Sequence, residues 1–365
     1  MSRLIEAMVC HAPGEPLRRE MVMLRDVRAD EVLVEIMASG LCHTDLHQLD
    51  GSSAPFPFPV IVGHEGAGIV REIGAAVSTV QPGDHVIPLT IAECGVCGNC
   101  RSGRTNLCEA FLATLGQPQD CVTLDGQAVS TYSGVGSLAR FVLVKEMNVA
   151  KIRKDVPFDL ACLAGCAVAT GVGAVTRTAH VQPGENVAVF GLGGIGLNVV
   201  QGARLAGAGR IIGIDINPER GAQAANFGLT DFIDPRACPD VPARIRQISD
   251  GGVNHAFECV GNATLMAQAL ESTRIGCGCC TVLGVPPDGT SMPLATFSLQ
   301  LGRTVKGSFL GNVKTRSELP KLLDLCASGD LDFDGLVSQR LPMSRVNEGF
   351  DLMRRGEALR VVVSF

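Results

Sequence analysis

Four cysteines close together carry the most specific chemistry in this sequence. Cys94, Cys97, Cys100 and Cys108 lie in one short segment with small and polar residues between them. Four thiolates in one loop can close a tetrahedral shell around zinc, and a closed shell predicts a structural rather than a catalytic ion. Four free thiols in an exposed loop and an iron–sulfur cluster are the alternatives.

A glycine-rich turn predicts a dinucleotide site. The segment Gly191-Leu192-Gly193-Gly194-Ile195-Gly196 has the G-x-G-x-x-G spacing, follows an apolar strand-like run and precedes a helix-like run. In that setting the glycines permit a tight turn, close approach of the backbone to a pyrophosphate, and helix–strand packing. Asp215 ends the next predicted strand, where a carboxylate would bind both ribose hydroxyls and repel a 2′-phosphate. The pattern therefore favours NAD over NADP, with Arg220 as a further ribose contact; a structural turn with a solvated Asp215 and a surface Arg220 is the alternative.

A second metal site would have to be assembled from residues far apart in the chain. Cys42, His64 and Cys166 each lie in a glycine-containing segment. Two thiolates and an imidazole with an open fourth position are typical of catalytic zinc. Spacing does not establish this set, because each residue taken alone is more often part of a core than a ligand.

The first part of the chain, residues 1–168, is expected to be rich in β-strands. Residues 31–37 alternate in polarity, and residues 60–62 precede a glycine-rich turn and a further strand that ends at Val70. Residues 81–84 predict a turn, and residues 85–88 predict a short strand.

The pattern changes near residue 169. Strands are predicted at residues 186–190, 211–215, 231–233, 255–258 and 280–284, with helical segments between them. Alternating strands and helices predict an α/β fold with a doubly wound parallel sheet, that is, a Rossmann domain. The tail, residues 310–365, is expected to hold an amphipathic helix around 320–328 and a last strand at 360–363.

Composition narrows the class of protein. The 365 residues carry a formal net charge of −6, and no basic run is present, so nucleic acid and anionic membranes are not expected as partners. No secretion signal pattern and no long apolar span is seen, and 15 cysteines then predict reduced thiols and a cytoplasmic location. The cysteines outside the two metal sets, including Cys277, Cys279 and Cys280, are interpreted as small buried hydrophobic residues.

Five segments in the same order resemble the zinc-containing medium-chain alcohol dehydrogenases. They are residues 40–45, 63–68, 94–108, 165–171 and 191–196, and the resemblance continues through residues 284–287 to Arg360. The sequence is most similar to the class III branch, the glutathione-dependent formaldehyde dehydrogenases.

The resemblance implies a role for each matching residue. Cys42, His64 and Cys166 match the catalytic zinc ligands, and Cys94, Cys97, Cys100 and Cys108 match the structural zinc lobe. Glu65 matches the acid behind the metal, Asp45 the carboxylate that orients His64, Thr44 the hydroxyl that bonds the substrate oxygen, and His47 the end of the proton relay. The remaining matches concern the cofactor. His43 and Arg360 match basic residues that contact the pyrophosphate, and Thr170 and Ile195 match residues that pack against the nicotinamide.

The family also implies an architecture and a mechanism. A GroES-like catalytic domain, residues 1–168 and 310–365, would enclose a Rossmann domain at residues 169–309, with the active site in the cleft and a homodimer or homotetramer as the assembly. Zinc would lower the pKa of the substrate hydroxyl, the proton would leave through Thr44 and His47, and hydride would pass to the nicotinamide. The alternatives are that His47 is a solvated surface histidine with no part in the proton relay, and that His43 is exposed and does not contact the phosphate.

The sequence departs from the class III branch where that branch binds its anionic substrate. The loop at residues 50–59 lacks the acidic residue that the branch carries beyond the first zinc ligand, and Leu112 stands in place of an arginine. Thr90 and Ser133 stand where relatives carry bulky residues. These changes favour a bulky or aromatic primary alcohol as substrate. S-(hydroxymethyl)glutathione, a zinc-independent reductase, a non-catalytic scaffold of the same fold and an enzyme that retains its NAD are the alternatives.

Overall fold

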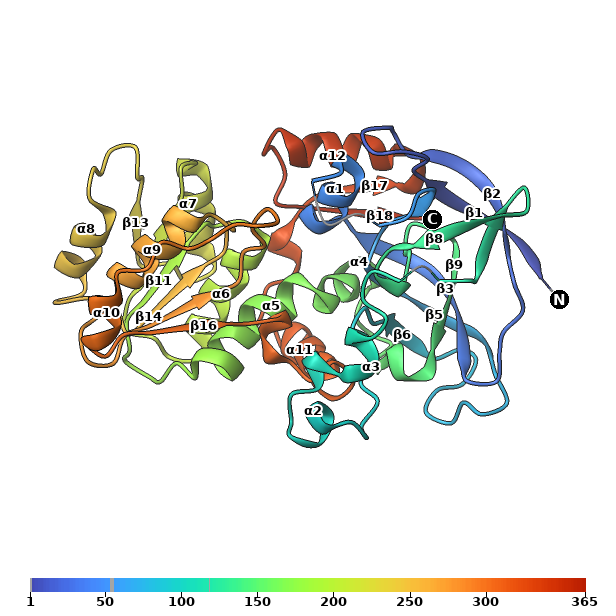
Figure 1. The fold of residues 1–365 in the computed structure, drawn as a ribbon, viewed down its shortest axis with the longest axis horizontal. Coiled ribbons are helices and arrows are strands. Elements are labelled where there is room, and N and C mark those ends of the chain that lie inside the picture. Colours follow the sequence, from blue (N-terminus) through green and yellow to red (C-terminus); the bar gives the residue numbers. More distant parts are fainter. Residues whose placement is uncertain (1, 53–55, 118) are drawn as a thin grey trace. The chain divides into compact units, whose positions relative to one another are not determined.

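The computed structural model describes residues 2–52, 56–117 and 119–365. The chain forms two compact units: unit 1 comprises Met1–Cys166 and Lys314–Phe365, and unit 2 comprises Ala167–Val313. In Figure 1 the blue and red ends of the chain therefore belong to the same unit, and the yellow-green to orange segment between them forms the other.

Unit 2 is built on one parallel sheet with the strand order β13-β12-β11-β14-β15-β16. Short apolar runs form its central strands because both faces of a parallel sheet are buried. The strands are β11 (Val187–Phe190), β12 (Ile211–Ile214), β13 (Asp231–Ile233), β14 (His255–Glu258), β15 (Cys279–Val282) and β16 (Thr304–Gly307). The predicted doubly wound sheet is confirmed.

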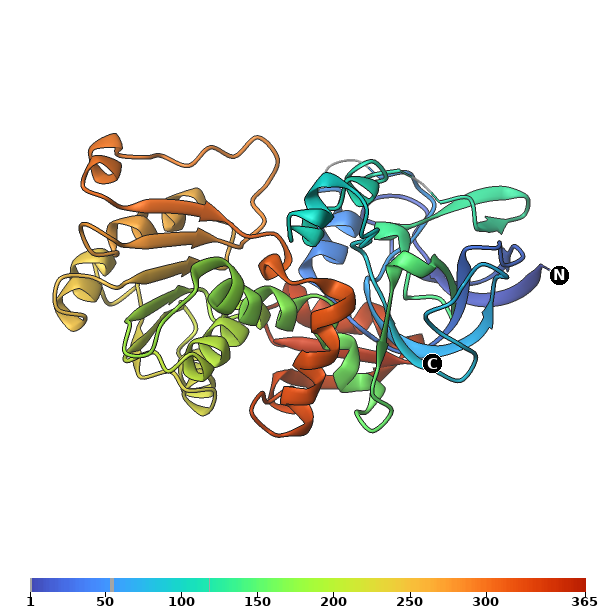
Figure 2. The same cartoon turned by 90° about the horizontal axis from the view of Figure 1, so that it is seen from below.

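Helices cover both faces of this sheet (Figure 2). Ala188 and Phe190 of β11 share a core with residues of α8 and α9. The opposite face of β11 packs against α6. The distance between them is short, since a side chain on Gly196 would lie 3.4 Å from Val189. The helices are α5 (Ala167–Gly173), α6 (Gly194–Leu205), α7 (Pro218–Asn226), α8 (Val241–Ile248), α9 (Ala263–Glu271) and α10 (Thr296–Gln300).

Unit 1 contains two mainly antiparallel sheets. The first has the order β1-β2-β7-β8-β4, and the second has the order β10-β6-β5-β3-β18-β17 with β9 also paired to β3. The strands are β1 (Arg3–Val9), β2 (Arg18–Leu24), β3 (Glu31–Gly40), β4 (Val60–Ile61), β5 (Glu65–Ile73), β6 (His85–Pro88), β7 (Val122–Leu124), β8 (Gln127–Thr131), β9 (Phe141–Lys145), β10 (Val149–Ile152), β17 (Val337–Pro342) and β18 (Arg360–Ser364).

The last strand of the chain completes the core of unit 1. β18 pairs with β3 in antiparallel register, with Val363 opposite Ser39, and this pairing brings Arg360 to the segment that follows β3. The helices of this unit are α1 (His43–Asp50), α2 (Gly98–Arg101), α3 (Glu109–Leu112), α4 (Phe158–Ala161), α11 (Thr315–Ala327) and α12 (Val346–Arg354).

Some elements differ from the sequence-based expectation. Gly66 and Gly68 lie inside β5 rather than in a turn. Glycine is needed at position 68 because β3 packs closely there: a side chain would lie 2.0 Å from the carbonyl oxygen of Glu35. The predicted tail helix begins earlier, at Thr315, whose hydroxyl bonds to the carbonyl oxygen of Ile91. The edge strand β16 was not predicted, because Thr304–Gly307 is short and mostly exposed and lacks a strand-like apolar run.

The interpretation of Cys277 as a buried residue is wrong. Its thiol group lies in an exposed turn, whereas Cys279 and Cys280 in β15 are buried as expected. The strand begins only at Cys279, so the burial that it provides does not extend to Cys277.

Within the described residues, no single helix has the length and apolar character needed to cross a membrane. One bent pair of helical segments, Phe158–Gly165 with Ala167–Ala179, passes the same test on length and composition alone.

Candidate active site and zinc sites

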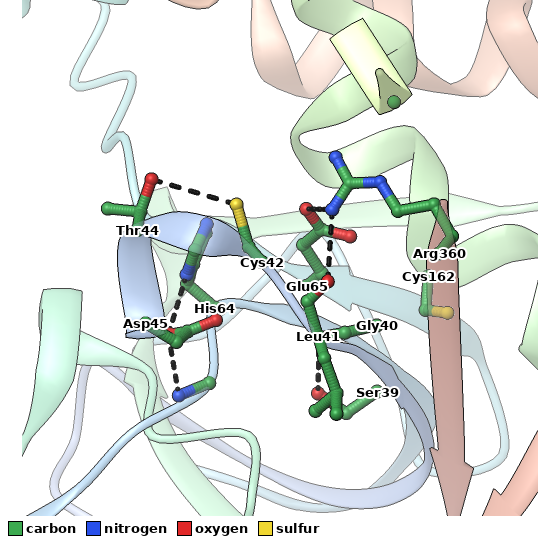
Figure 3. Close-up of polar contacts among 12 residues, drawn as sticks. Ser39, Gly40, Leu41, Cys42, Thr44, Asp45, His64, Glu65, Cys162 and Arg360 are labelled. Atoms are coloured by element: carbon green, nitrogen blue, oxygen red, sulfur yellow. Dashed lines mark hydrogen bonds and ion pairs between the residues drawn. The ribbon is translucent and has the colours of Figure 1, made fainter. Parts of the chain in front are cut away.

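Four residues of unit 1 converge on one point. Cys42 precedes α1 as its N-cap, and Cys166 follows the short helical turn Cys162–Gly165. His64 directly precedes β5, and Glu65 is the first residue of that strand. One ligand atom from each of Cys42, His64, Glu65 and Cys166 lies within 4.8 Å of all the others. The structure thus brings together the three residues that the sequence left scattered, and it adds Glu65 to them. Figure 3 shows Cys42, His64 and Glu65 of this set.

Asp45 fixes the orientation of the His64 ring. Asp45 is fully buried, and its Oδ1 lies 2.9 Å from His64 Nδ1 and accepts a bond from the backbone N–H of Gly63 at 2.9 Å. A carboxylate on Nδ1 leaves Nε2 as the ligand atom, which is the usual arrangement behind a metal-binding histidine. The geometry fits the role that the resemblance implies for Asp45.

A buried ion pair lies beside the cluster. Arg360 Nη1 donates to Glu65 Oε1 at 3.0 Å and to the carbonyl oxygen of Leu41 at 3.1 Å (Figure 3). Burial raises the pKa of Glu65 to about 7, although Arg360 opposes this shift. Arg360, expected from the resemblance at the pyrophosphate, is thus engaged within unit 1.

The donor set suits a divalent zinc ion. The thiol of Cys166 lowers the pKa of Cys42 well below 9.0, and the neighbouring His64 acts in the same direction against burial. A low thiol pKa favours thiolate, the form that binds metal. Glu65 Oε2 and Asp45 Oδ2 are buried without a hydrogen-bond partner among the described residues, so each leaves an unsatisfied acceptor atom beside the ligand set, as a site built around a cation would.

The predicted proton-relay residues share helix α1. Thr44 Oγ1 accepts a hydrogen bond from the thiol of Cys42 at 3.6 Å, which places the hydroxyl beside the metal ligands. His47 lies three residues further along, on the same side of the helix, and its Nδ1 is 3.0 Å from Ser52 Oγ. His43, at the first turn of α1, is exposed. Sequence reasoning missed Ser52, because nothing in a serine next to a glycine marks it as a histidine partner.

The four-cysteine lobe also fits zinc. One sulfur atom from each of Cys94, Cys97, Cys100 and Cys108 lies within 4.8 Å of the others. Backbone N–H groups of Glu109 and Cys100 lower the pKa of Cys97 to about 6, whereas burial raises that of Cys100 to about 12. No open position is needed when all four ligands are protein thiolates, so the arrangement serves structure.

The glycine-rich turn in unit 2 has the geometry that its spacing predicts. Gly191 has a φ of 90°, and a side chain on Gly196 would lie 1.8 Å from the carbonyl oxygen of Gly191. Gly193 is the N-cap of α6, so the free N–H groups of that helix face the turn. This is the arrangement that binds a pyrophosphate in doubly wound folds.

Asp215 directly follows β12 and braces this turn. Its Oδ2 accepts from the backbone N–H of Leu192 at 2.8 Å, and its Oδ1 accepts from that of Asn217 at 2.8 Å. Asn217 in turn caps α7 through Glu219 N, with Pro218 at the first helical position. Asn217 escaped the sequence analysis, although an Asn-Pro pair before a helix is a recognisable start signal.

The other predicted cofactor residues lie in the same unit. Arg220 Nη1 would be 3.4 Å from a side chain on Gly193, so the guanidinium reaches the glycine-rich turn. Thr170 is buried in α5, and Ile195 is half-buried in α6. The zinc residues belong to unit 1 and these cofactor residues belong to unit 2.

A cavity of about 370 Å³ lies in unit 1. Its wall includes Phe56, Thr90, Phe111, Tyr132 and Ser133. The ring of Tyr132 meets that of His64 edge-on at 6.3 Å between centroids, so one residue of the cavity wall packs against a residue of the metal cluster. Residues 53–55 of the loop that departs from the class III pattern, and residue 118, lie outside the described residues.

Comparisons with known proteins agree with this geometry. The alcohol dehydrogenase GroES-like domain family matches residues 28–154, and the zinc-binding dehydrogenase family matches residues 194–328. The chain therefore belongs to the zinc-containing alcohol dehydrogenase family, as the sequence motifs indicated, and it is a zinc-dependent dehydrogenase that uses a nicotinamide cofactor.

Individual relatives cover essentially the whole chain. An S-(hydroxymethyl)glutathione dehydrogenase from Paracoccus denitrificans is 43% identical and aligns with 98% of this chain and 99% of its own length, which confirms the similarity to the class III branch. The crystal structure of benzyl alcohol dehydrogenase from Acinetobacter calcoaceticus has a TM-score of 0.93 at 32% identity and covers 100% of this chain and 99% of that one. A zinc-binding dehydrogenase from Sinorhizobium meliloti, solved with NADP, has a TM-score of 0.81 at 26% identity over the full length of both chains.

Proposed function

We propose that this protein catalyses reversible hydride transfer between NAD and a primary alcohol with a bulky substituent. The observation that carries the proposal is the cavity in unit 1 whose wall includes Tyr132, the residue whose ring meets that of His64 edge-on. At about 370 Å³ it falls in the range that holds ligands larger than ethanol. Thr90 and Ser133 lie on its wall, where the resemblance implies larger side chains in relatives. The structural similarity to a benzyl alcohol dehydrogenase supports the same substrate class.

The residues divide the work of the reaction. Cys42, His64 and Cys166 would hold a zinc ion that, when bound, acidifies the substrate hydroxyl. Thr44 orients that hydroxyl and takes up its proton as it releases its own, and His47, partly exposed on the next turn of α1, would receive the relayed proton and pass it to solvent. Asp45 keeps His64 in its ligating orientation, and Glu65 with Arg360 supplies a buried charge pair behind the cluster.

The cofactor would be held by unit 2. Gly191, Gly193, Gly194 and Gly196 give the backbone close approach to a pyrophosphate. Asp215 supports NAD over NADP because a carboxylate repels a 2′-phosphate, with Arg220 as a ribose contact. We further propose that His43 and Arg360 reach the pyrophosphate and that Thr170 and Ile195 pack against the nicotinamide, which supplies hydride-accepting chemistry when bound.

S-(hydroxymethyl)glutathione is the second candidate substrate. The 43% identical relative with that name supports it more directly than the 32% identical benzyl alcohol dehydrogenase supports an aromatic alcohol. Against it, Leu112 stands where the class III branch has an arginine for the anionic conjugate.

A substrate comparison tests both candidates. We would measure kcat/KM with NAD for ethanol, benzyl alcohol, cinnamyl alcohol and formaldehyde mixed with glutathione. The proposal predicts that an aromatic alcohol exceeds ethanol by at least about tenfold, since each buried methylene contributes about 0.8 kcal/mol. A glutathione adduct that exceeds every free alcohol would establish the second candidate, and a preference for ethanol would contradict both.

The assembly and the cellular location stay predictions. The family resemblance supports a homodimer or homotetramer, which light scattering coupled to size exclusion measures directly. The cytoplasmic location expected from the sequence has its test in cell fractionation.

A further inference from the structure

Glu258, the last residue of β14, is a buried carboxylate that lies outside the predicted set of site residues. It has no exposed surface. Its Oε1 accepts three backbone hydrogen bonds, from Val260 at 2.9 Å, Gly261 at 2.8 Å and Asn262 at 3.2 Å. Its Oε2 is buried with no hydrogen-bond partner among the described residues. One oxygen atom therefore fixes the whole loop between β14 and α9.

The same residue ties that loop to its neighbours. The carbonyl oxygen of Glu258 accepts from the N–H groups of Leu283 at 2.8 Å and Gly284 at 3.0 Å, after β15. Cys259 N donates to the carbonyl oxygen of Phe190, the last residue of β11, at 2.9 Å. The loops after β11, β14 and β15 are thus joined at the carboxyl edge of the sheet, where doubly wound folds bind their ligands.

Close packing leaves these loops little freedom. A side chain on Gly191 would lie 2.5 Å from Val260 Cγ2, and one on Gly284 would lie 1.9 Å from Gly261 N. Gly261 has a φ of 86°, a conformation that the bond to Glu258 holds in place. Val260 is 52% exposed, so this loop presents an apolar surface directly beside the glycine-rich turn.

We propose that Glu258 is a positioning residue for the nicotinamide cofactor, which holds Val260–Asn262 against the turn Gly191–Gly193. Burial raises the pKa of Glu258, whereas the three backbone N–H groups that bond to it act in the opposite direction. Burial of a carboxylate contributes little net free energy to folding, so we attribute the presence of Glu258 to the loop conformation that it holds. The inference rests on the proposed use of NAD in unit 2.

The test is direct binding of NADH, followed by its fluorescence, to the zinc-loaded full-length protein. Glu258→Ala leaves three N–H groups without an acceptor, so we expect the Kd for NADH and the KM for NAD to rise about tenfold or more, with an unchanged KM for the alcohol. If Glu258→Ala does not fold, Glu258→Asp is the substitute. It retains the charge on a shorter side chain and should give a smaller loss of NADH affinity than the loss of about tenfold expected for Glu258→Ala. Glu258→Gln keeps an acceptor oxygen and should stay within about threefold of wild type.

Glu185 offers a matched control at the other edge of the same sheet. It accepts from Gln182 N at 2.8 Å and lies 2.9 Å from His255 Nε2, before β11 and β14 begin. Glu185→Ala should lower the Tm but leave the Kd for NADH within about twofold of wild type. Unchanged NADH binding by Glu258→Ala and Glu258→Asp, or an equal loss in Glu185→Ala, would overturn the positioning role. Wild-type protein that binds neither NADH nor NADPH would instead overturn the proposed cofactor itself.

Discussion

Asp45 shows how one buried side chain supports the metal cluster. It bonds to His64 Nδ1 and to the backbone of Gly63 at once, so its loss frees both the ring and the segment that carries it. We expect Asp45→Ala to lower kcat/KM by about 10- to 100-fold and to reduce zinc at the Cys42–His64–Cys166 set, as second-sphere changes do at other zinc sites. Zinc analysis beside steady-state kinetics measures this, and Asp50→Ala, on the exposed end of α1, is the control. Full zinc content and wild-type kinetics in Asp45→Ala would contradict the role.

Asp215 braces the glycine-rich turn and is proposed to select NAD, and one substitution removes the carboxylate on which both depend. Asp215→Ser removes the carboxylate expected to repel a 2′-phosphate, and it also removes the bond to Leu192 N. The ratio of kcat/KM for NAD to that for NADP should fall by about tenfold or more. Glu219→Gln, an exposed carboxylate four residues further along the chain, should leave the ratio unchanged. An unaltered ratio in Asp215→Ser would mean that the cofactor preference has another origin.

At the scale of elements, local sequence patterns were enough to predict those elements whose residues lie close together in the sequence. The four-cysteine lobe and the glycine-rich turn could be predicted because their ligands and glycines are close neighbours. Strands β13 and β14 were predicted at their observed bounds from apolar runs between turns. Cys42, His64 and Cys166 could be joined only through the family resemblance, because long-range pairing such as β18 with β3 leaves no local signal.

Residues that act through hydrogen bonds to the backbone escaped prediction. Ser52 Oγ donates to the carbonyl oxygen of His47, and Glu258 accepts from backbone N–H groups, in each case through a backbone geometry that exists only in the folded chain. Asn217 caps α7 through Glu219 N and was missed although the Asn-Pro pair marks it locally. Edge strand β16 escaped for a different reason, since its residues are mostly exposed and carry no apolar pattern.

The four-cysteine lobe gives a prediction about one element. Cys97→Ser should release the structural zinc and lower the Tm by about 4 °C or more, because metal binding contributes folding free energy. Calorimetry with zinc analysis measures both quantities. Cys277→Ser, a change at an exposed thiol outside both metal clusters, should leave the Tm and the zinc content as they are. A lobe that tolerates Cys97→Ser without loss of zinc would not be a four-thiolate site.

At the scale of the molecule, unit 1 should be sensitive to acid. Burial alone would raise the pKa of Glu35, yet bonds from Arg71 and Arg140 hold it below 4.5. A carboxyl group with a lowered folded-state pKa contributes stability above its unfolded pKa and loses that contribution as the pH falls through the folded value. Glu31 and Asp84 of the same unit show the same direction of shift.

Glu35→Gln tests this pH dependence. It should lower the free energy of unfolding by about 2 kcal/mol at pH 7, because two arginines lose their charged partner, and the difference from wild type should vanish well below pH 4.5. Tyr132 is the only tyrosine in a chain without tryptophan, so its fluorescence reports unit 1 in urea titrations. Glu72→Gln, whose partner Arg3 is exposed, should cost less than about 1 kcal/mol. A Glu35→Gln difference that persists at low pH would show that the charge of Glu35 is not its cause.

Zinc content measured against turnover is the most direct test of the central claim that Cys42, His64 and Cys166 hold a catalytic metal beside a separate structural one. Zinc per subunit should be about two in protein that reduces NAD with a primary alcohol, and activity should fall in proportion as the more accessible ion is removed by a chelator and return when zinc is restored. Full activity with about one zinc ion per subunit, bound in the four-cysteine lobe, would contradict the account.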